Sequence, residues 1–268
     1  MPNLDNRGAT PRRDLHVFYV LDTSGSMEGN PIQILNQAML ETIGVLKKVA
    51  KSNGDAQLKL SVLEFGSMVR WMQKDGPQKV EDFVWQDLSA GGLTNIGAAL
   101  KELNQKLSTR EFLKSASGTM LPIIIFMTDG YATDEYEKEL EEIKKNKLFR
   151  KATKIGFAIG DNPDVEMIAH LAGDSEAVVH TDDLALFARL LQFVSVTSST
   201  LASTSQIAGG VINNGRTAMT EAIRQSGAKP EDVRPGFEYL DGDTVVLDDS
   251  ALQYSSSGIA WEDSDDDW

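Results

Sequence analysis

The sequence predicts an α/β protein with a doubly wound, mostly parallel sheet, helices on both faces and one antiparallel edge strand. Short apolar runs alternate with segments of helical period from 14 to 196, and alternation at this spacing needs right-handed crossover connections. The run Ile123–Met127 is apolar throughout, as in a strand covered on both faces. The 268 residues suffice for the core of one domain plus an appendage.

The expected elements follow in chain order. A first strand covers His16–Leu21, and Asn30-Pro31 then supplies an N-cap with proline at the first helical position. The strands Leu58–Phe65 and Val69–Met72, joined through Gly66-Ser67, form the antiparallel edge. The later elements are expected to be a helix Ile96–Leu107, the strand Ile123–Met127, a helix at 134–150, a strand Ile155–Ile159, a helix Asp164–Leu171, a strand Ala177–Val179 and a helix Leu184–Val194.

Four segments are expected along the chain. A polar N-terminal arm at 1–13 precedes the α/β domain at 14–196, and a Ser/Thr-rich linker follows at 197–206. The C-terminal extension at 207–268 is expected to be partly disordered or bound to a partner. From Asp241 to Trp268 it contains nine acidic residues and no lysine or arginine, so it ends in an acidic tail.

Composition narrows the classes of partner and compartment. The net charge of −14 disfavours nucleic acid and anionic membranes, which attract basic patches. The absence of cysteine rules out disulfides and thiolate metal sites. We expect no membrane-spanning segment, because no continuous apolar run is long enough, and no signal peptide, because the first residues lack an apolar centre. The expected location is cytoplasmic, with proteins or cations as partners.

Polar side chains lie at three points: after the first predicted strand, before the helix Ile96–Leu107, and after the strand Ile123–Met127. A doubly wound sheet gathers the loops at its strand ends into one crevice. Taken singly, the groups have ordinary roles, because Asp, Ser and Gly form turns and a threonine can cap a helix. Taken together they supply two carboxylates and three hydroxyls without imidazole or thiolate, a set that suits Mg²⁺ or Mn²⁺. The predicted metal ligands are Asp22, Ser24, Ser26, Thr94 and Asp129.

These motifs resemble the metal-ion-dependent adhesion site of von Willebrand factor type A domains, which have a Rossmann-like fold. The resemblance covers roughly 14–196. It implies that the three hydroxyls bind the cation, that the two aspartates act directly or through water, and that an Asp or Glu of a partner protein completes the shell. The matching segments are Asp22-x-Ser24-x-Ser26, Gly91–Gly97 around Thr94, and Phe126–Gly130.

The first motif, with Met27, Gly29, Pro31 and Ile32, is similar to that of bacterial TerY-like proteins of tellurite-resistance and stress-response gene groups. That resemblance implies an adaptor for a Ser/Thr kinase or a metal-dependent protein phosphatase. The C-terminal region departs from some relatives, because it lacks their cysteine-rich extension. Residues expected to contact the partner are Met27, Gly92, Asn95, Tyr131, Trp261 and Trp268.

Several alternatives stay open. A metal-assisted phosphoester hydrolase is disfavoured because no general base, phosphate loop or serine–histidine pair accompanies the motifs. A structural scaffold with a vestigial metal site is the other alternative. The acidic tail could also occupy the cation site of its own or a neighbouring molecule. The histidines are expected to be structural, and Met68, Trp71 and Met72 either pack or form a contact patch; the histidines are His16, His170 and His180.

Overall fold

A computed structural model describes residues 12–108, 118–160, 163–207, 215–228 and 234–235. Most of the predicted N-terminal arm, the acidic tail, Trp261 and Trp268 therefore lie outside the described residues. The predictions made for them are not addressed by the structure.

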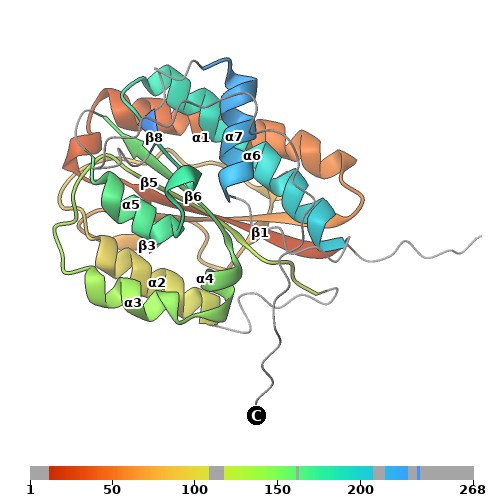
Figure 1. The fold of residues 1–268 in the computed structure, drawn as a ribbon, viewed down its shortest axis with the longest axis horizontal. Helices are drawn as coiled ribbons and strands as arrows, with labels where there is room; N and C mark the ends of the chain where they lie inside the picture. Colours follow the sequence, from red (N-terminus) through yellow and green to blue (C-terminus); the bar gives the residue numbers. More distant parts are fainter. Residues whose placement is uncertain (1–11, 109–117, 161–162, 208–214, 229–233, 236–268) are drawn as a thin grey trace, which may run out of the picture. The chain divides into compact units, whose positions relative to one another are not determined.

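A mixed sheet of mostly parallel strands forms the centre of the fold, which confirms the predicted class (Figure 1). Its strand order is β3-β2-β1-β5-β6-β7-β8, and β4 also pairs with β2. The four inner pairings, from β2 through β7, are parallel. The strands are β1 (Arg13–Asp22), β2 (Ala56–Phe65), β3 (Val69–Trp71), β4 (Gln78–Lys79), β5 (Ile123–Thr128), β6 (Thr153–Ile159), β7 (Val178–Thr181) and β8 (Arg234–Pro235).

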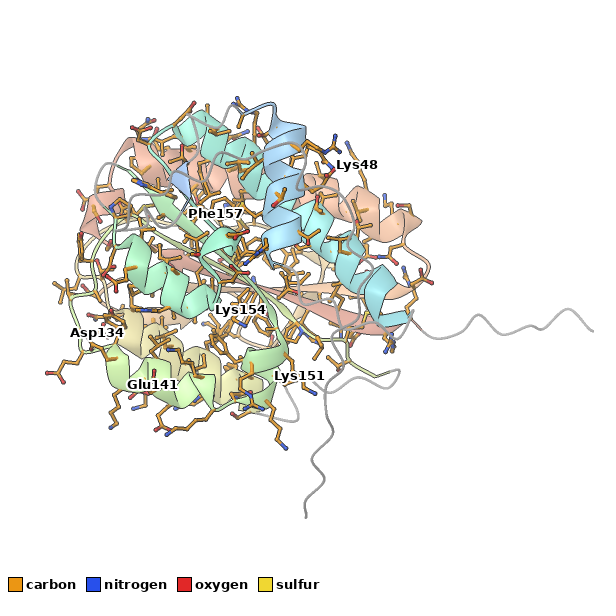
Figure 2. The ribbon with its side chains drawn as sticks, viewed as in Figure 1. Lys48, Asp134, Glu141, Lys151, Lys154 and Phe157 are labelled. Atoms are coloured by element: carbon orange, nitrogen blue, oxygen red, sulfur yellow. The ribbon has the colours of Figure 1, made fainter. Side chains whose placement is uncertain are left out.

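Helices cover both faces of the sheet, because each inner strand is apolar on both sides. One face packs against α1, α6 and α7, and the other against α2, α3, α4 and α5 (Figure 1). Phe157 is buried in the first layer, whereas Lys48 of α1 points outward (Figure 2). The helices are α1 (Asn30–Ser52), α2 (Ile96–Ser108), α3 (Glu137–Lys144), α4 (Lys147–Lys151), α5 (Val165–Ala172), α6 (Leu184–Ile207) and α7 (Gly215–Ser226), with 3-10 turns η1 (Gly25–Met27), η2 (Val80–Asp82) and η3 (Ser175–Ala177).

The parallel register aligns the strand ends that carry the motifs. Leu21 pairs with Met127, so Asp22 and Thr128 end neighbouring strands at the same level. On the other side Asp22 pairs with Phe65 at the end of β2. We call this side of the sheet, where the parallel strands end, the carboxyl edge, and the side where they begin the amino edge.

The prediction of a linker at 197–206 was wrong, because α6 continues without interruption to Ile207. Serine and threonine are poor helix formers in isolation, but here their hydroxyls donate to carbonyls one turn back, as Ser203 does to Ser199 O at 2.7 Å and Thr200 to Val196 O at 2.9 Å. Ser198 and Ser199 are buried, and α6 packs against α1 and α7. Tertiary packing therefore overrides the weak local propensity.

The helix α6 also corrects the expectation about span-length segments. Its stretch Leu184–Ser203 is long and apolar enough to cross a bilayer by length and composition alone. The sequence criterion of a continuous apolar run missed it, since serines and threonines interrupt the run. Nearly half of the stretch is buried within the fold, including Leu190, Leu191 and Val194, as in the core helix of a globular domain.

Two further differences concern the sheet edge and the charged helix. The strand β8 pairs antiparallel with β7. Both outer strands of the sheet, β3 and β8, are therefore antiparallel to their neighbours, and not one alone. The segment 134–150 forms two helices, because the side chain of Asn146 accepts hydrogen bonds from Leu148 N and Phe149 N and so starts α4 anew.

Candidate metal site

Asp22 is fully buried at the end of β1, and both of its carboxylate oxygens accept hydrogen bonds. Ser24 N donates to Oδ1 at 2.7 Å, and the hydroxyl of Thr128 donates to Oδ2. Burial raises the pKa of Asp22 to about 6, partly opposed by these hydrogen bonds, while the nearby charge of Asp129 raises it further. A carboxylate is thus fixed in orientation at a place where its charge is poorly solvated.

A chain of hydrogen bonds links the first loop to the loop after β5. Ser24 Oγ lies 3.0 Å from Ser26 Oγ, and Ser26 Oγ donates to Asp129 Oδ1 at 2.7 Å. Thr94 reaches the same point, since a methyl group placed on Gly130 would lie 3.5 Å from Ser26 Oγ and 3.9 Å from Thr94 Oγ1. All five predicted ligands therefore converge on one spot at the carboxyl edge, from three separate loops.

Main-chain hydrogen bonds hold these loops together. Gly91 N donates to Thr23 O at 2.9 Å, and Gly25 N donates to Gly92 O at 3.0 Å. Gly66 approaches so closely that a methyl group there would lie 3.2 Å from Thr23 O. The donor set is consequently positioned by backbone contacts, so that little ordering is left for a ligand to impose.

Thr94 is not the cap of α2. The carboxylate of Asp134 takes that role, accepting from Gly97 N and Ala98 N at 3.0 Å each. Thr94 is held by its backbone instead, because its N–H donates to Thr133 Oγ1 and its carbonyl accepts from Thr133 N, both at 2.9 Å. Its side chain is buried, and its hydroxyl lies on the same side of Gly130 as that of Ser26.

The chemistry of this group fits a hard divalent cation. Two carboxylates and three hydroxyls present only oxygen, the ligand atom that Mg²⁺ and Mn²⁺ prefer. No three His, Cys, Asp or Glu side chains cluster anywhere in the described ranges, so this site depends on its hydroxyls as well as its two carboxylates. Burial also raises the pKa of Asp129, so two poorly solvated carboxylates face each other across the serines. A bound cation would relieve that unfavourable charge.

The predicted partner surface is only partly present. Met27 is buried in the core, so its assignment to the surface was wrong; the η1 turn directs its side chain beneath the loop toward α1. Tyr131 is 54% exposed beside the site. Gly92 is exposed with φ of 82°, and Asn95 is half-buried, donating to Ser67 O at 3.1 Å.

Two other open questions are answered by burial. Trp71 and Met72 pack on the core while Met68 is 82% exposed, so the hairpin mostly packs. None of the three histidines contacts the five predicted ligands: His16 is buried in β1, His170 is exposed at the end of α5, and His180 bonds Gly160 O at 2.7 Å.

Sequence reasoning missed two residues that position ligands and one that caps the neighbouring helix. Thr128 orients Asp22 and Thr133 holds Thr94, whereas Asp134 caps α2 and contacts no proposed ligand. Thr128 could have been identified from the sequence, because its hydroxyl directly precedes Asp129 at the end of a buried strand. The other two act on a loop about 40 residues away in sequence, so no local pattern identifies them.

The sequence profile of the von Willebrand factor type A domain matches residues 16–192. The chain belongs to this family. A curated relative is the inter-alpha-trypsin inhibitor heavy chain H1 of Mesocricetus auratus, 30% identical over 138 residues, which make up 49% of this chain and 14% of that protein.

Solved structures agree on the fold. Proximal thread matrix protein 1 of the mussel byssus, with a zinc-occupied metal-ion-dependent adhesion site motif, has a TM-score of 0.51 at 17% identity over 70% of this chain and 48% of that one. The von Willebrand factor type A protein of Catenulispora acidiphila has a TM-score of 0.52 at 16% identity, covering 69% and 43%. The chain thus spans less than half the length of each of these relatives.

Proposed function

We propose that this chain is a metal-dependent protein-binding adaptor. The five oxygen-donor residues hold Mg²⁺ or Mn²⁺, and an Asp or Glu of a partner protein completes the shell of the cation. The observation that carries the proposal is the hydrogen-bonded chain from Asp22 through Ser24 and Ser26 to Asp129, with Thr94 beside it. The zinc-occupied motif of the mussel protein supports the same reading of the family site.

The ligand types explain why a carboxylate would be attracted. Hydroxyls are neutral, so a divalent cation held by three of them and two aspartates keeps charge that an incoming carboxylate can neutralise. Tyr131 at 54% exposure, Leu93 at 54% and Met68 at 82% add apolar surface on the loops around the site. A partner would therefore present an acidic side chain flanked by apolar ones.

The resemblance to TerY-like proteins supports a finer proposal. In it the adaptor is bacterial and cytoplasmic, serves stress response or tellurite resistance, and binds a Ser/Thr kinase or a metal-dependent protein phosphatase. The match of the Asp22–Pro31 segment carries this part of the proposal.

The competing functions are a metal-assisted phosphoester hydrolase and a scaffold with a vestigial site. A hydrolase needs a general base, and none of the three histidines contacts the five ligands. We therefore propose a non-enzymatic role. A scaffold would bind its partner equally well without metal.

The test is calorimetric titration of the chelated full chain with Mg²⁺, Mn²⁺ and Zn²⁺, comparing wild type with Asp22→Ala and Ser24→Ala. We expect one saturable site that both variants lose. Asp134→Asn is the matched control, since it removes a carboxylate from the same edge but from the cap of α2. Equal metal binding by Asp22→Ala and wild type would refute the proposal.

A second measurement separates the three functions. A metal-dependent pull-down with and without chelator reports partner binding, and release of phosphate from a generic ester reports hydrolysis. Partner capture that is lost with chelator and with Asp129→Ala supports the adaptor. Capture that survives both changes supports the scaffold, and ester hydrolysis lost in the Asp129→Ala variant supports the enzyme.

A further inference from the structure

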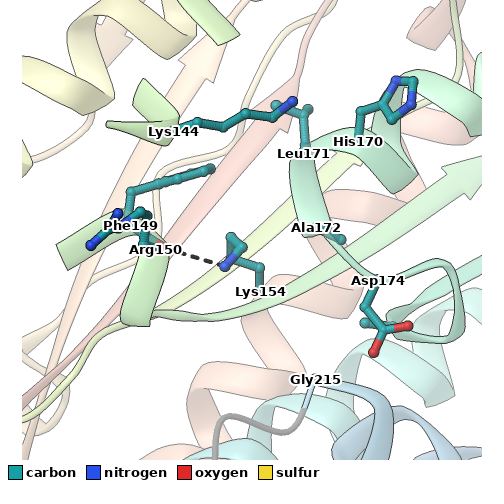
Figure 3. Close-up of a pocket in the computed structure, with 11 residues that line it drawn as sticks. Lys144, Phe149, Arg150, Lys154, His170, Leu171, Ala172, Asp174 and Gly215 are labelled. Atoms are coloured by element: carbon teal, nitrogen blue, oxygen red, sulfur yellow. Dashed lines mark hydrogen bonds between the residues drawn. The ribbon is translucent and has the colours of Figure 1, made fainter. Parts of the chain in front are cut away.

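A cavity of about 450 Å³ lies at the amino edge, where β6 begins (Figure 3). The candidate metal site lies at the other end of the parallel strands. The walls of the cavity come from the ends of α3, α4 and α5, the start of β6, the turn η3 and the start of α7. Its volume falls within the roughly 300–1,000 Å³ that small-molecule sites occupy in proteins. We call it the basic cavity, after the residues described next.

The walls carry more positive than negative side chains, although the whole chain has a net charge of −14. Lys144, Arg150, Lys154 and His170 line the cavity, against a single carboxylate, Asp174. Figure 3 shows Lys144 and Lys154 extending into the space between the Phe149–Arg150 wall and the Leu171–Ala172 wall. The two lysines are therefore the cations best placed for a bound group.

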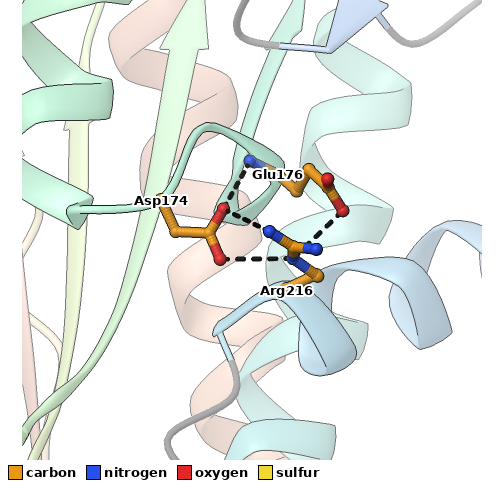
Figure 4. Close-up of polar contacts among 3 residues, drawn as sticks. All are labelled: Asp174, Glu176 and Arg216. Atoms are coloured by element: carbon orange, nitrogen blue, oxygen red, sulfur yellow. Dashed lines mark hydrogen bonds and ion pairs between the residues drawn. The ribbon is translucent and has the colours of Figure 1, made fainter. Parts of the chain in front are cut away.

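The carboxylate of Asp174 already has partners, although it shares one guanidinium with Glu176. Arg216 of α7 donates to both of its oxygens at 3.3 Å and also pairs with Glu176 at 3.0 Å (Figure 4). Asp174 further accepts from Glu176 N at 3.0 Å. Asp174 therefore has partners other than the lysines. Lys144 pairs with Glu141 Oε1 at 3.0 Å, a carboxylate outside the cavity lining, so Lys154 is the lysine with no carboxylate partner in the described part of the chain.

Lys154 lacks a carboxylate partner among the described residues. Its ammonium group donates to Phe149 O and Ala152 O at 3.2 Å each and stands 5.3 Å from the centre of the Phe149 ring. A lysine has three N–H donors, so one remains for a bound group. Burial lowers the pKa of Lys154, which means that its positive charge is poorly compensated as it stands.

Helix ends explain part of this charge but not all of it. The carboxyl ends of α3, α4 and α5 attract basic side chains in their last turns, as Lys144, Arg150 and His170 show. Lys154 instead belongs to β6, and α7 contributes the positive end of its dipole from Gly215. A methyl group at Gly215 would collide with Lys154 O, so α7 packs closely onto the start of β6.

We propose that the basic cavity binds a small phosphate-bearing anion, of the size of an organic phosphate monoester, through Lys154 and Lys144 with Arg150 at its mouth. Two ammonium groups match the dianionic charge of a phosphate, and the rings and chains of Phe149 and Leu171 supply the apolar side that an organic substituent needs. This function is separate from that of the candidate metal site.

The experiment titrates the full chain, with chelator present, with inorganic phosphate and with phenyl phosphate at constant ionic strength. Amide resonances of Gly173, Asp174 and Gly215 should shift saturably. Lys154→Met should weaken binding at least about tenfold, the loss of one charge-assisted hydrogen bond. Phenyl phosphate binding more tightly than inorganic phosphate would support an organic ligand.

The matched control is Lys151→Met, which removes an exposed positive charge at the end of α4 that does not line the cavity (Figure 2). It should change affinity by less than about twofold. Equal losses in Lys151→Met and Lys154→Met, or no saturable shift, would overturn the proposal. If Lys154→Met fails to fold, Lys144→Met decides in the same way. Asp22→Ala should bind phosphate normally, which separates this test from that of the metal site.

Discussion

The two edges of the sheet differ in the sign of the charge they collect. At the carboxyl edge the helices begin, and Asp22, Asp129, Asp134 and Asp164 gather there. At the amino edge the helices end, and basic residues collect. Asp134 and Lys151 lie toward these opposite ends (Figure 2). Helix dipoles alone favour this division, so charge sign by itself does not identify a site.

What separates a site from a solvated helix end is how the polar groups are held. The carboxylates of Asp134 and Asp164 accept hydrogen bonds from backbone N–H groups, as helix caps do. Asp22, Ser24, Ser26 and Asp129 bond one another across two loops instead, which leaves oxygen atoms facing a common point. At the amino edge Lys154 is the analogous exception, because it is half-buried in a strand and lacks a carboxylate partner in the described part of the chain.

The largest expected effect is a difference in metal affinity between variants of two aspartates at the carboxyl edge, Asp22 and Asp134. Asp22→Ala should weaken Mg²⁺ or Mn²⁺ binding by more than about 100-fold, beyond what loss of an outer-shell group costs. Asp134→Asn should leave metal affinity unchanged and lower the free energy of unfolding by about 1 kcal/mol through the lost cap. Calorimetry and urea unfolding measure the two effects. Similar metal affinities in both variants would show that the edge binds cations diffusely.

A second expected effect concerns the opposite end of β1, where His16 is 1% exposed and its ring nitrogens have no partner among the described residues. Burial lowers the pKa of His16 from 6.5 to about 4. Below pH 6.5 the histidine of the unfolded chain takes up a proton, whereas that of the folded chain does not. The free energy of unfolding therefore falls by up to about 3 kcal/mol as the pH drops from 6.5 toward 4.

His16→Phe tests this effect, since it keeps a ring stacked on Phe18, now at 6.2 Å between centroids, without a titrating group. Urea unfolding of the chelated protein at several pH values should show a shallower acid dependence in the variant than in wild type. Identical slopes would mean that His16 gains a partner or solvent in solution.

A smaller effect is the pH dependence of metal binding. The pKa of Asp22 is raised to about 6, so the metal-free site holds a proton below that pH, and the cation must displace it. Affinity should be full above the pKa and fall about fourfold between roughly pH 7.5 and pH 5.5. Calorimetry in buffers of different ionisation enthalpy should detect proton release at the lower pH. Constant affinity without proton release would contradict this expectation.

A last effect, similar in size, concerns Arg216, which pairs with Asp174 beside the basic cavity. Arg216 is half-exposed, so Arg216→Gln should lower the free energy of unfolding by less than about 1 kcal/mol. It should also weaken phosphate binding by about twofold to fivefold, because the carboxylate is then left uncompensated at the cavity wall. The titration described above measures it, and unchanged affinity would place the anion away from Asp174.

The sequence predicts those parts of the fold whose pattern is local. The apolar runs of β1 and β5 and the motifs that follow them are contiguous, so the sequence predicts these strands and four of the five proposed ligands directly; the fifth, Thr94, comes from a third short motif before α2. The end of α6 could not, because its serines become helical only through contacts with α1 and α7. The prediction that Met27 contacts a partner was wrong for a similar reason, since a 3-10 turn buries its side chain. The basic cavity draws on six elements, α3, α4, β6, α5, η3 and α7, and leaves no local pattern.

The continuation of α6 determines the C-terminal boundary of a fragment that keeps the fold when it is expressed alone or fused to another protein. The family match stops at residue 192, yet Ser198, Ser199 and Ala202 of α6 are buried, as are Ala218 and Met219 of α7. A fragment trimmed to the match would expose the surfaces that these residues cover, and exposed apolar patches promote aggregation. Portability of the binding loops therefore depends on keeping the chain through Ser226, more than 90 residues beyond the last proposed ligand, Asp129.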